Sequence, residues 1–295
     1  MKPASEGWDP YVERALREDL GDTGDLTTRA VVPESARARG TIRCKDTGVL
    51  AGIELAVRAF QQIEPACQVA RLKADGDRMV PGDRVLEVTG RAHSLLAGER
   101  VALNFVQRLS GIATLTARFV ERVRGTGCAV LETRKTTPGL RLLEKYAVQV
   151  GGGENHRFGL FDRILIKNNH FALCGEKRDL AGYQRVVARA VAFGHGTGPV
   201  AVEARDTLEL DAAIAGGADI VLLDNMAPPV LREAVAHARK TARALDRTVL
   251  LEASGGITLE NAAEIAATGV DRISVGALTH SFRSLDLSMA LEPLP

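Results

Sequence analysis

Cationic side chains gather in one stretch of the chain, from Glu132 to His170, where they stand next to short apolar runs. They are Arg134, Lys135, Arg157 and Lys167, with His156 and His170. This stretch holds seven Lys and Arg against four Asp and Glu, a net charge of +3, while the whole chain of 295 residues carries only +1. Cationic side chains that follow neighbouring strands can lie together at the ends of those strands. The stretch therefore predicts a socket for a polyanion, and a solvated basic surface is the alternative.

Short apolar strands that alternate with helices would position these cations. The expected strands are 129–131, 164–166, 200–202, 220–223, 249–251 and 273–275. The expected helices are 139–150, 176–193, 208–215, 229–244 and 259–267. Such alternation predicts an α/β fold with parallel strands and right-handed crossovers. An open doubly wound sheet and a barrel both fit, and we favour the barrel because polar residues follow nearly every strand.

In a barrel, the residues that follow the strands share one rim. They are Arg134, Lys135, Lys167, Glu203, Asp224 and Glu252. Carboxylates beside a phosphate site either hold Mg²⁺, directly or through water, or accept sugar hydroxyls, and Glu203 and Asp224 are the candidates. The alternative is a structural salt bridge to an arginine, which we expect for Glu132 or Glu252.

Glycines end the last two expected strands. Ser254-Gly255-Gly256 and Gly276 each precede a helical segment, so backbone N–H groups can hold a phosphate there. Ordinary tight turns are the alternative.

A different pattern occupies the first third of the chain. We expect a helix from Asp9 that ends at Gly21, then a small α+β module over 40–92 with one helix at 53–63. A long helix follows over 94–123, with a break or kink at Gly111. The domains are expected at 1–113, 114–281 and 282–295, with the last segment packing back on the first domain.

Composition restricts the partners. The sequence pI is about 7.7 and both charge signs occur throughout, which argues against a nucleic-acid or membrane-surface binder and favours small-molecule substrates. The cysteines Cys44, Cys67, Cys128 and Cys174 are scattered, as in a reduced cytoplasmic protein. Neither a signal peptide nor an apolar run of about 18 residues occurs. We therefore expect a soluble, cytoplasmic protein.

Several motifs together resemble the quinolinate phosphoribosyltransferase family. In chain order they are EDLGDTGDLTT, AGIE, LNFVQRLSGIAT, RKTTPGLR, GGGENHR, LIKNNH, LLDNM, LEASGGI and SVGALTHS, so the resemblance covers nearly the whole chain. It implies an N-terminal α/β sandwich and an incomplete α/β (TIM-like) barrel. It also implies a homodimer, which could extend to a higher oligomer, in which the N-terminal domain of one subunit closes the barrel mouth of the other.

The resemblance also implies an activity and site residues. The reaction would convert quinolinate and phosphoribosyl pyrophosphate to nicotinate mononucleotide, pyrophosphate and CO₂ in de novo NAD synthesis. The residues implied for quinolinate are Arg108, donated across the subunit interface, and Arg134, His156, Arg157 and Lys167. Those implied for phosphoribosyl pyrophosphate and its Mg²⁺ are Lys135, Glu203, Asp224, Ser254, Gly255 and Gly276, of which Lys135, Glu203 and Asp224 would be catalytic and Glu203 and Asp224 would be metal ligands.

Two positions depart from the family pattern. Asn168 stands where an acidic residue is common, and Ala204-Arg205 replaces a more acidic or apolar pair. These departures concern the charge near Lys167 and Glu203. The residues alone leave three other functions open: a related phosphoribosyltransferase acting on another base, a Schiff-base lyase that uses Lys167, and a non-catalytic phosphate-binding protein.

Overall fold

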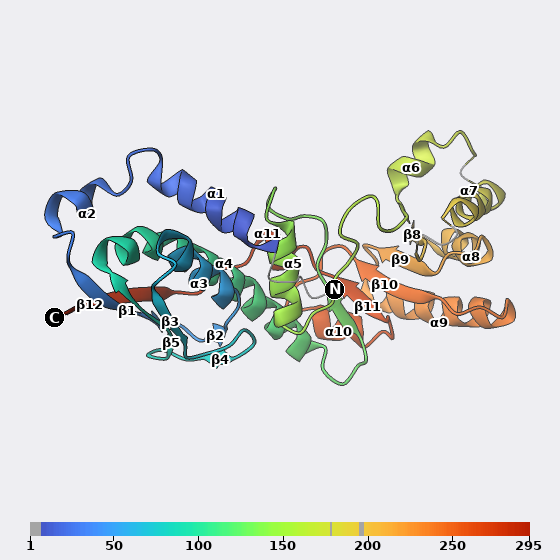
Figure 1. The fold of residues 1–295 in the computed structure, drawn as a ribbon. Helices are drawn as coiled ribbons and strands as arrows, with labels where there is room; N and C mark the ends of the chain where they lie inside the picture. The colour runs from blue at the N-terminus through green and yellow to red at the C-terminus, as the bar shows by residue number, and fades with distance from the viewer. Residues whose placement is uncertain (1–6, 178, 195–197) are drawn as a thin grey trace. The chain divides into compact units, whose positions relative to one another are not determined.

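A computed structural model describes residues 7–177, 179–194 and 198–295 of the chain. Its internal contacts divide the chain into two compact units (Figure 1). Unit 1 comprises Met1–Ala117, Pro138–Gly152 and Ser281–Pro295, and unit 2 comprises Arg118–Thr137 and Gly153–His280. Each unit has its own sheet and its own interior, and each is described separately.

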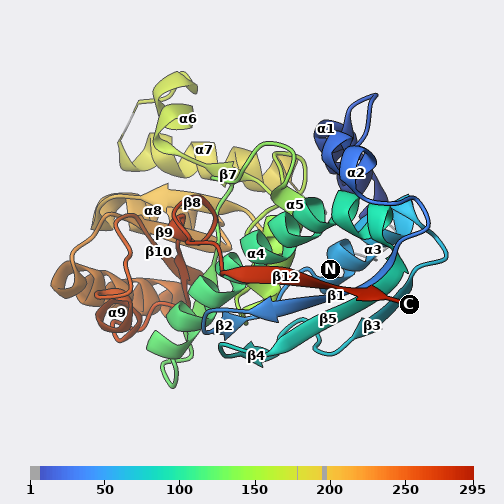
Figure 2. The ribbon, with the colours of Figure 1, turned by 90° about the vertical axis from the view of Figure 1, so that its left-hand side faces the viewer.

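The main sheet of unit 1 is antiparallel and has the order β12-β1-β5-β3 (Figure 2). Its strands are β1 (Arg37–Cys44), β3 (Gln68–Arg71), β5 (Arg84–Arg91) and β12 (Leu287–Leu294). A second, two-stranded sheet pairs β2 (Gly48–Val49) with β4 (Arg78–Met79). The C-terminal strand β12 pairs with β1 along its full length, from Arg37 opposite Leu294 to Cys44 opposite Leu287. The end of the chain is therefore part of the N-terminal sheet.

The helices of unit 1 are α1 (Asp9–Leu20), α2 (Leu26–Val31), α3 (Ile53–Ile63), most of α4 (Ala92–Arg122) and α5 (Arg141–Val150). The expected helix at 53–63 is confirmed. Its N-terminus is held by Asp75, whose two carboxylate oxygens accept the backbone N–H groups of Gly52 and Ile53. The buried side of α3, with Ala56 and Phe60 fully covered, faces the interior of the unit.

The long helix α4 runs through Gly111, so the expected break there is wrong. A Cβ at Gly111 would lie 2.4 Å from its nearest neighbour, the backbone oxygen of Arg283, well inside van der Waals contact. Glycine at this position makes room for the returning C-terminal segment and does not end the helix.

Helix α5, which the sequence pattern grouped with the barrel helices, belongs to unit 1 by its contacts. The Tyr146 hydroxyl donates to Asp75 Oδ2 at 2.5 Å. The Tyr146 ring also meets Trp8 edge-on, with 4.9 Å between ring centroids. These contacts tie α5 to the start of α3 and to α1.

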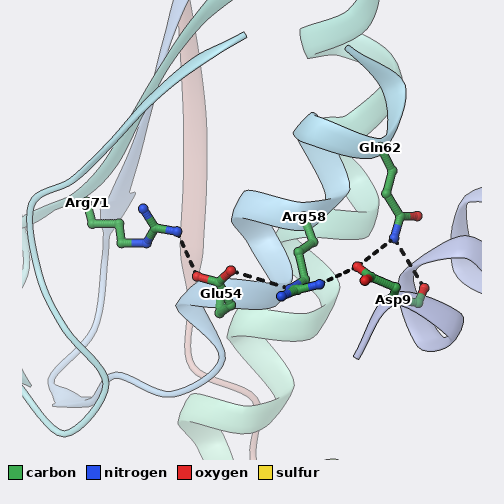
Figure 3. A network of polar contacts seen from close by, with 5 residues as sticks. All are labelled: Asp9, Glu54, Arg58, Gln62 and Arg71. Carbon is green, nitrogen blue, oxygen red and sulfur yellow. Dashed lines mark hydrogen bonds and ion pairs between the residues drawn. The ribbon is translucent and has the colours of Figure 1, made fainter. Parts of the chain in front are cut away.

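Five polar side chains form a network on unit 1 (Figure 3). It runs from Arg71 on β3 through Glu54 and Arg58 on α3 to Asp9 on α1, which Gln62 also contacts. Asp9 is the first residue of α1 and its carboxylate binds Arg58 and Gln62, so it does not cap the helix.

Unit 2 contains a parallel six-stranded sheet with the order β6-β11-β10-β9-β8-β7. Its strands are β6 (Ala129–Leu131), β7 (Leu165–Ile166), β8 (Ala201–Ala204), β9 (Ile220–Asp224), β10 (Leu250–Ser254) and β11 (Arg272–Ser274). The edge strands β6 and β7 are not paired with each other, so the sheet does not close. This confirms the predicted incomplete α/β barrel with a separate N-terminal domain that carries its own antiparallel sheet.

The helices of unit 2 are α6 (Asn168–Leu173), α7 (Leu180–Phe193), α8 (Thr207–Ala215), α9 (Pro228–Ala244), α10 (Ala262–Ala266) and α11 (Ala277–His280). Helix α6 was not expected from the sequence. Helix α7 begins at Leu180, later than expected, because Asp179 caps it by accepting the Gly182 N–H at 2.7 Å. The expected range also included residue 178, which lies outside the described residues.

The interior of unit 2 contains a cluster of apolar side chains from adjacent strands. Leu165, Ala201, Ile220 and Leu222 are buried together, and Leu250 packs against them. All four cysteines of the chain are free thiols, and three of them are buried. Within the described residues, no helix combines the length and the apolar character needed to cross a membrane.

Candidate functional site

A cavity of about 710 Å³ lies in unit 2 at the carboxyl ends of the parallel strands. It is lined by nine of the residues that the sequence selected, namely Arg134, Lys135, His156, Arg157, Lys167, Asp224, Ser254, Gly255 and Gly276. Of the other selected residues, Gly256 also lines it, whereas Arg108, His170, Glu203 and Glu252 do not. The rim that the barrel hypothesis required therefore exists.

Arg134 and Lys135 enter the cavity on the loop that follows β6. The Lys135 N–H donates to Thr133 Oγ1 at 3.1 Å, which tightens this loop. Arg134 Nε is buried and has no hydrogen-bond partner among the described residues. Arg134 lines the cavity, so an anion bound there can pair with its guanidinium.

His156 lies over two buried carboxylates. Its backbone N–H donates to Glu132 Oε1 at 3.1 Å, and its Nδ1 accepts the Arg157 N–H at 2.8 Å. Because Nδ1 is an acceptor, the ring proton is on Nε2, which lies 3.4 Å from Glu252 Oε1. Both ring nitrogens of His156 therefore have partners within the protein.

Glu252 is fully buried, and its partners are not the arginines that the sequence suggested. Its Oε1 accepts the Ser274 hydroxyl and faces His156, while Oε2 is buried without a partner within the described chain. Burial raises the pKa of this carboxyl, but the hydrogen bonds from His156 and Ser274 outweigh burial and hold the pKa below its usual value. Glu252 is therefore an ionised group beneath the cavity.

Arg157 is held by the loop that follows it. Its Nη1 donates to the Arg163 carbonyl at 3.1 Å, and Asp162 closes the loop by accepting the N–H groups of Phe158 and Gly159 at 2.6 and 2.9 Å. Arg157 Nε is buried and unpaired within the described chain. Burial, and then the charge of Arg134, lower the pKa of Arg157. Two like charges kept together in this way favour a dianionic ligand.

Lys167 and Asn168 hold Glu203 from two sides. Lys167 Nζ lies 3.4 Å from Glu203 Oε2, and Asn168 Nδ2 donates to Glu203 Oε1. The Tyr183 hydroxyl donates to the backbone oxygen of Glu203. The neutral Asn168 therefore acts as a donor to Glu203, where an acidic residue would repel it.

The opposite side of the cavity is built from backbone. Asn225 has a positive φ of 54°, and its N–H donates to the Ser254 oxygen at 2.8 Å. Gly255 also has a positive φ of 95°, and a Cβ there would collide with the Asn225 side chain. Only glycine fits this turn, which leaves the backbone of Ser254 and Gly255 open to the cavity.

Arg108 lies on α4 in unit 1. Its Nη2 contacts Glu144 Oε1 at 2.5 Å, and its guanidinium stacks over Phe282 with 4.9 Å to the ring centroid. Glu144 is fully buried, and the Arg108 side chain is 30% exposed.

Comparison with known families gives a clear result. The model of the quinolinate phosphoribosyl transferase C-terminal domain matches residues 112–290, and that of the N-terminal domain matches residues 25–110. The chain belongs to the quinolinate phosphoribosyltransferase family. All residues that line the cavity lie within the C-terminal match.

Relatives of this phosphoribosyltransferase family cover almost the whole chain. Nicotinate-nucleotide pyrophosphorylase [carboxylating] of Mycobacterium leprae (strain TN) is 44% identical over 95% of both chains. Among solved structures, NadC from Streptococcus pyogenes has a TM-score of 0.91 at 38% identity and covers both chains fully. The nicotinate-nucleotide pyrophosphorylase from Francisella tularensis has a TM-score of 0.89 at 37% identity and covers 99% of this chain and 98% of that one.

Some cavity residues were not predicted from the sequence, although they lie in the family motifs or directly beside them. They include Thr133, Asn225, Thr258, Ser274 and His280. LLDNM and SVGALTHS contain three of them, and Thr133 and Thr258 each adjoin a motif, so adjacency to the selected residues was a usable signal. Ser274 could not be assigned from spacing, because its importance comes from contact with Glu252 across the sheet.

The carboxylates were tested for a Mg²⁺ site. Within the described part of the chain no group of three or more His, Cys, Asp or Glu side chains could hold a metal. Mg²⁺ often binds through one or two carboxylates plus substrate phosphates and water. Asp224 lines the cavity and fits that mode, whereas Glu203 faces Lys167 and Asn168. The residues therefore fit an ion that arrives with a phosphorylated substrate better than a resident ion.

Proposed function

We propose that the chain transfers the phosphoribosyl group of phosphoribosyl pyrophosphate to quinolinate, with loss of CO₂, to give nicotinate mononucleotide and pyrophosphate for NAD synthesis. The quinolinate ring nitrogen attacks the anomeric carbon of the ribose while the bond from that carbon to the pyrophosphate oxygen breaks. The carboxylate next to the ring nitrogen then leaves as CO₂. Its electron pair stays on the ring carbon, beside the cationic nitrogen, and a proton from solvent replaces it.

The observation that carries this proposal is the group of cationic side chains that line the cavity. Arg134 and Arg157 both line it, and so does Lys167, whose side chain is about half exposed. Quinolinate carries two adjacent carboxylates, which supply acceptors to several cations at once. The three side chains would orient the ring nitrogen toward the ribose.

His156 differs from these three cations because both of its ring nitrogens already have partners within the protein. The family resemblance places it with the quinolinate-binding residues, and it lines the cavity. Its ring nitrogens, however, already meet Arg157 N–H and Glu252. A direct hydrogen bond from His156 to quinolinate would therefore require the ring to give up one of these partners.

Phosphoribosyl pyrophosphate would occupy the part of the cavity that is lined by Asp224 and the glycines. Asp224, Ser254, Gly255 and Gly276 offer a carboxylate for the ribose and backbone for phosphate, and Lys135 offers an ammonium for the pyrophosphate. As pyrophosphate leaves, the ribose gains oxocarbenium character, so Asp224 would stabilise the transition state electrostatically. No covalent nucleophile is needed, because positioning and charge supply the catalysis.

Mg²⁺, when bound with the substrate phosphates, would neutralise charge on the departing pyrophosphate. Asp224 would hold it directly or through water. Glu203 would bind the Mg²⁺ ion only after its contact with Asn168 or Lys167 is broken. In the structure as it stands, Glu203 holds Lys167 in place.

We also propose a homodimer with shared sites, which could extend to a higher oligomer. Arg108 does not line the cavity of its own chain; its guanidinium pairs with Glu144, and its side chain is 30% exposed. An arginine built in this way is suited to reach a dicarboxylate in the partner's site. The free cysteines support a cytoplasmic location.

The test of the reaction uses purified protein with phosphoribosyl pyrophosphate, Mg²⁺ and either quinolinate or nicotinate. We expect CO₂ and nicotinate mononucleotide from quinolinate, and far slower turnover of nicotinate, which lacks the second carboxylate. A chain that consumes nicotinate faster, or releases no CO₂ from quinolinate, would contradict the proposal and favour a transferase for another base.

The shared site is tested by mixing two inactive variants. Arg108→Ala and Lys135→Ala subunits should partly recover activity together, because one site of each mixed dimer keeps both residues. Subunit exchange is verified by native mass spectrometry. Exchange without recovery would remove the shared site and leave the reaction untouched.

No observation favours the other functions that the sequence left open. The lyase would need Lys167 as a free amine, but its ammonium lies 3.4 Å from the Glu203 carboxylate. Borohydride trapping with a carbonyl substrate should leave Lys167 unmodified. A protein that only binds phosphate would show no turnover in the assay above.

A further inference from the structure

Two neighbouring strands of unit 2 bring the Lys135 loop against helix α11. β6 and β11 pair in parallel with Leu131 opposite Ser274, and the Val275 N–H donates to the Leu131 oxygen at 2.8 Å. The chain beyond β6 leads to Lys135, and the chain beyond β11 turns into α11. The two segments therefore leave the sheet side by side.

Thr279 of α11 connects these segments. Its side chain is almost fully buried, at 1% exposure. Its Oγ1 lies 2.9 Å from the backbone oxygen of Lys135 and 3.3 Å from that of Gly276. A hydroxyl has a single proton to donate, so the shorter contact to Lys135 receives it. Threonine in a helix can bond to a carbonyl of its own preceding turn, and Thr279 makes such a contact to Gly276, but its shorter contact is to Lys135, outside the helix.

Lys135 is fixed at its backbone and free at its end. Thr133 accepts its N–H, and Thr279 donates to its carbonyl. Its stem also packs close to Gly276, where a Cβ would lie 3.2 Å from Lys135 Cδ. The residue as a whole is exposed and lines the cavity. The direction of the stem is therefore set by the backbone, while the ammonium can meet a ligand.

We infer that Thr279 is a positioning residue for Lys135, and that its buried hydroxyl aims the lysine stem at the pyrophosphate-binding side of the cavity. This inference rests on the proposed function, which gives Lys135 the pyrophosphate. Without the hydroxyl, the Lys135 backbone loses one of the two hydrogen bonds that Thr133 and Thr279 make with it. The ammonium then spends less time at the phosphate position.

The test compares Thr279→Val with a matched variant, Thr268→Val. Thr268 is also buried, at 5% exposure, and its hydroxyl donates to a backbone oxygen, that of Ile265, at 2.6 Å. Thr268 does not line the cavity and does not contact Lys135. Both variants lose one buried hydroxyl of the same type in the same unit. A difference between them in ligand binding therefore reports on position and not on general destabilisation.

Binding of inorganic pyrophosphate with Mg²⁺ is measured by calorimetry, and KM is measured for each substrate. We expect Thr279→Val to weaken pyrophosphate binding and raise the KM for phosphoribosyl pyrophosphate about five- to tenfold, as for one lost hydrogen bond. The KM for quinolinate should stay within twofold. Thr279→Ser, which keeps the hydroxyl, should restore binding, and Thr268→Val should bind as the wild type does.

Equal pyrophosphate binding by the Thr279→Val and Thr268→Val proteins would overturn the inference, as would a Thr279→Ser protein as weak as Thr279→Val. If Thr279→Val folds poorly, Thr279→Ala is compared with Thr279→Ser, and the same difference is required. A wild-type protein that binds pyrophosphate without turning over quinolinate would overturn the proposed reaction and leave this comparison valid. A wild-type protein that turns over quinolinate but does not bind pyrophosphate would overturn this inference and leave the proposed reaction in place.

Discussion

Charged side chains in the two units have different surroundings. In unit 1, Arg71, Glu54, Arg58 and Asp9 form a chain of ion pairs (Figure 3). The side chains at its two ends, Asp9 and Arg71, are about half exposed, and Glu54 and Arg58 between them are 28% and 19% exposed. In unit 2, the carboxylate of Glu252 is completely buried beneath the cavity with His156 and Ser274. The first group joins elements of the fold, and the second supports a site.

This difference in burial indicates which polar contacts support the candidate site and which only join elements of the fold. Exposed ion pairs contribute little, about 0–1 kcal/mol each, because water and salt compete for both partners. A buried charge is costly unless it is paired, and removing one partner leaves the other without compensation. A chain keeps such a group where it also needs a preset geometry, and the Glu252 cluster borders the candidate site.

The largest expected effect comes from replacing an arginine in each region. Arg157→Lys should raise the KM for quinolinate about a hundredfold, because lysine cannot reproduce the fixed fork of donors beside Arg134. Arg58→Lys should leave both KM values within twofold. Steady-state kinetics with each substrate varied checks this. A similar effect of the two changes would remove the functional distinction between the regions.

The next effect is on stability. Glu252→Gln should lower the free energy of unfolding by about 2–3 kcal/mol at neutral pH, because Ser274 and His156 lose a charged acceptor in a buried place. Glu54→Gln, the control in unit 1, should cost about 0.5 kcal/mol or less. Urea unfolding followed by circular dichroism measures both. If Glu252→Gln lowered the free energy of unfolding no more than Glu54→Gln does, the buried cluster around Glu252 would not contribute more stability than the ion pairs of unit 1.

The sequence could predict the features that depend on local pattern. The strands of unit 2 were found because each is a short apolar run before a polar residue, and AVL coincides with β6. The convergence of Arg134, Lys167 and Asp224 on one cavity followed from the shared rim of parallel strands. Regular spacing and sheet geometry were sufficient for these features.

The features that depend on contacts between distant residues could not be predicted. Gly111 reads as a helix break, but glycine is needed there because the C-terminal segment crosses α4. A salt bridge to an arginine was the alternative expected for Glu132 or Glu252, but the partners of Glu252 are Ser274 and His156. The placement of α5 in unit 1 depends on Tyr146 reaching Asp75. In each case the deciding neighbour is remote in sequence and has no local signature.

The dependence of unfolding free energy on pH should give a further difference between the Glu252 cluster of unit 2 and the ion pairs of unit 1. The pKa of Glu252 in the folded state lies below its usual value, and in the unfolded state it is about 4.3. The ionised carboxylate therefore stabilises the fold above that unfolded value, and this contribution disappears as the pH falls through the folded pKa. We expect the stability difference between wild type and Glu252→Gln to be constant near neutral pH and to shrink in acid. A difference that grows in acid would contradict the assigned charge.

The smallest expected effect concerns salt. Arg58→Met keeps the apolar stem but removes the charge that holds the pKa of Asp9 below its usual value. At low ionic strength it should cost less than about 1 kcal/mol of unfolding free energy, and in 1 M NaCl almost nothing, because the Debye length is then only about 3 Å. The cost of Glu252→Gln should persist in 1 M NaCl, since salt does not reach a fully buried carboxylate. Unfolding curves at the two salt concentrations give both values. If 1 M NaCl reduced the unfolding cost of Glu252→Gln as much as that of Arg58→Met, Glu252 would be accessible to solvent ions. The two units would then differ only in the degree to which their charges are shielded.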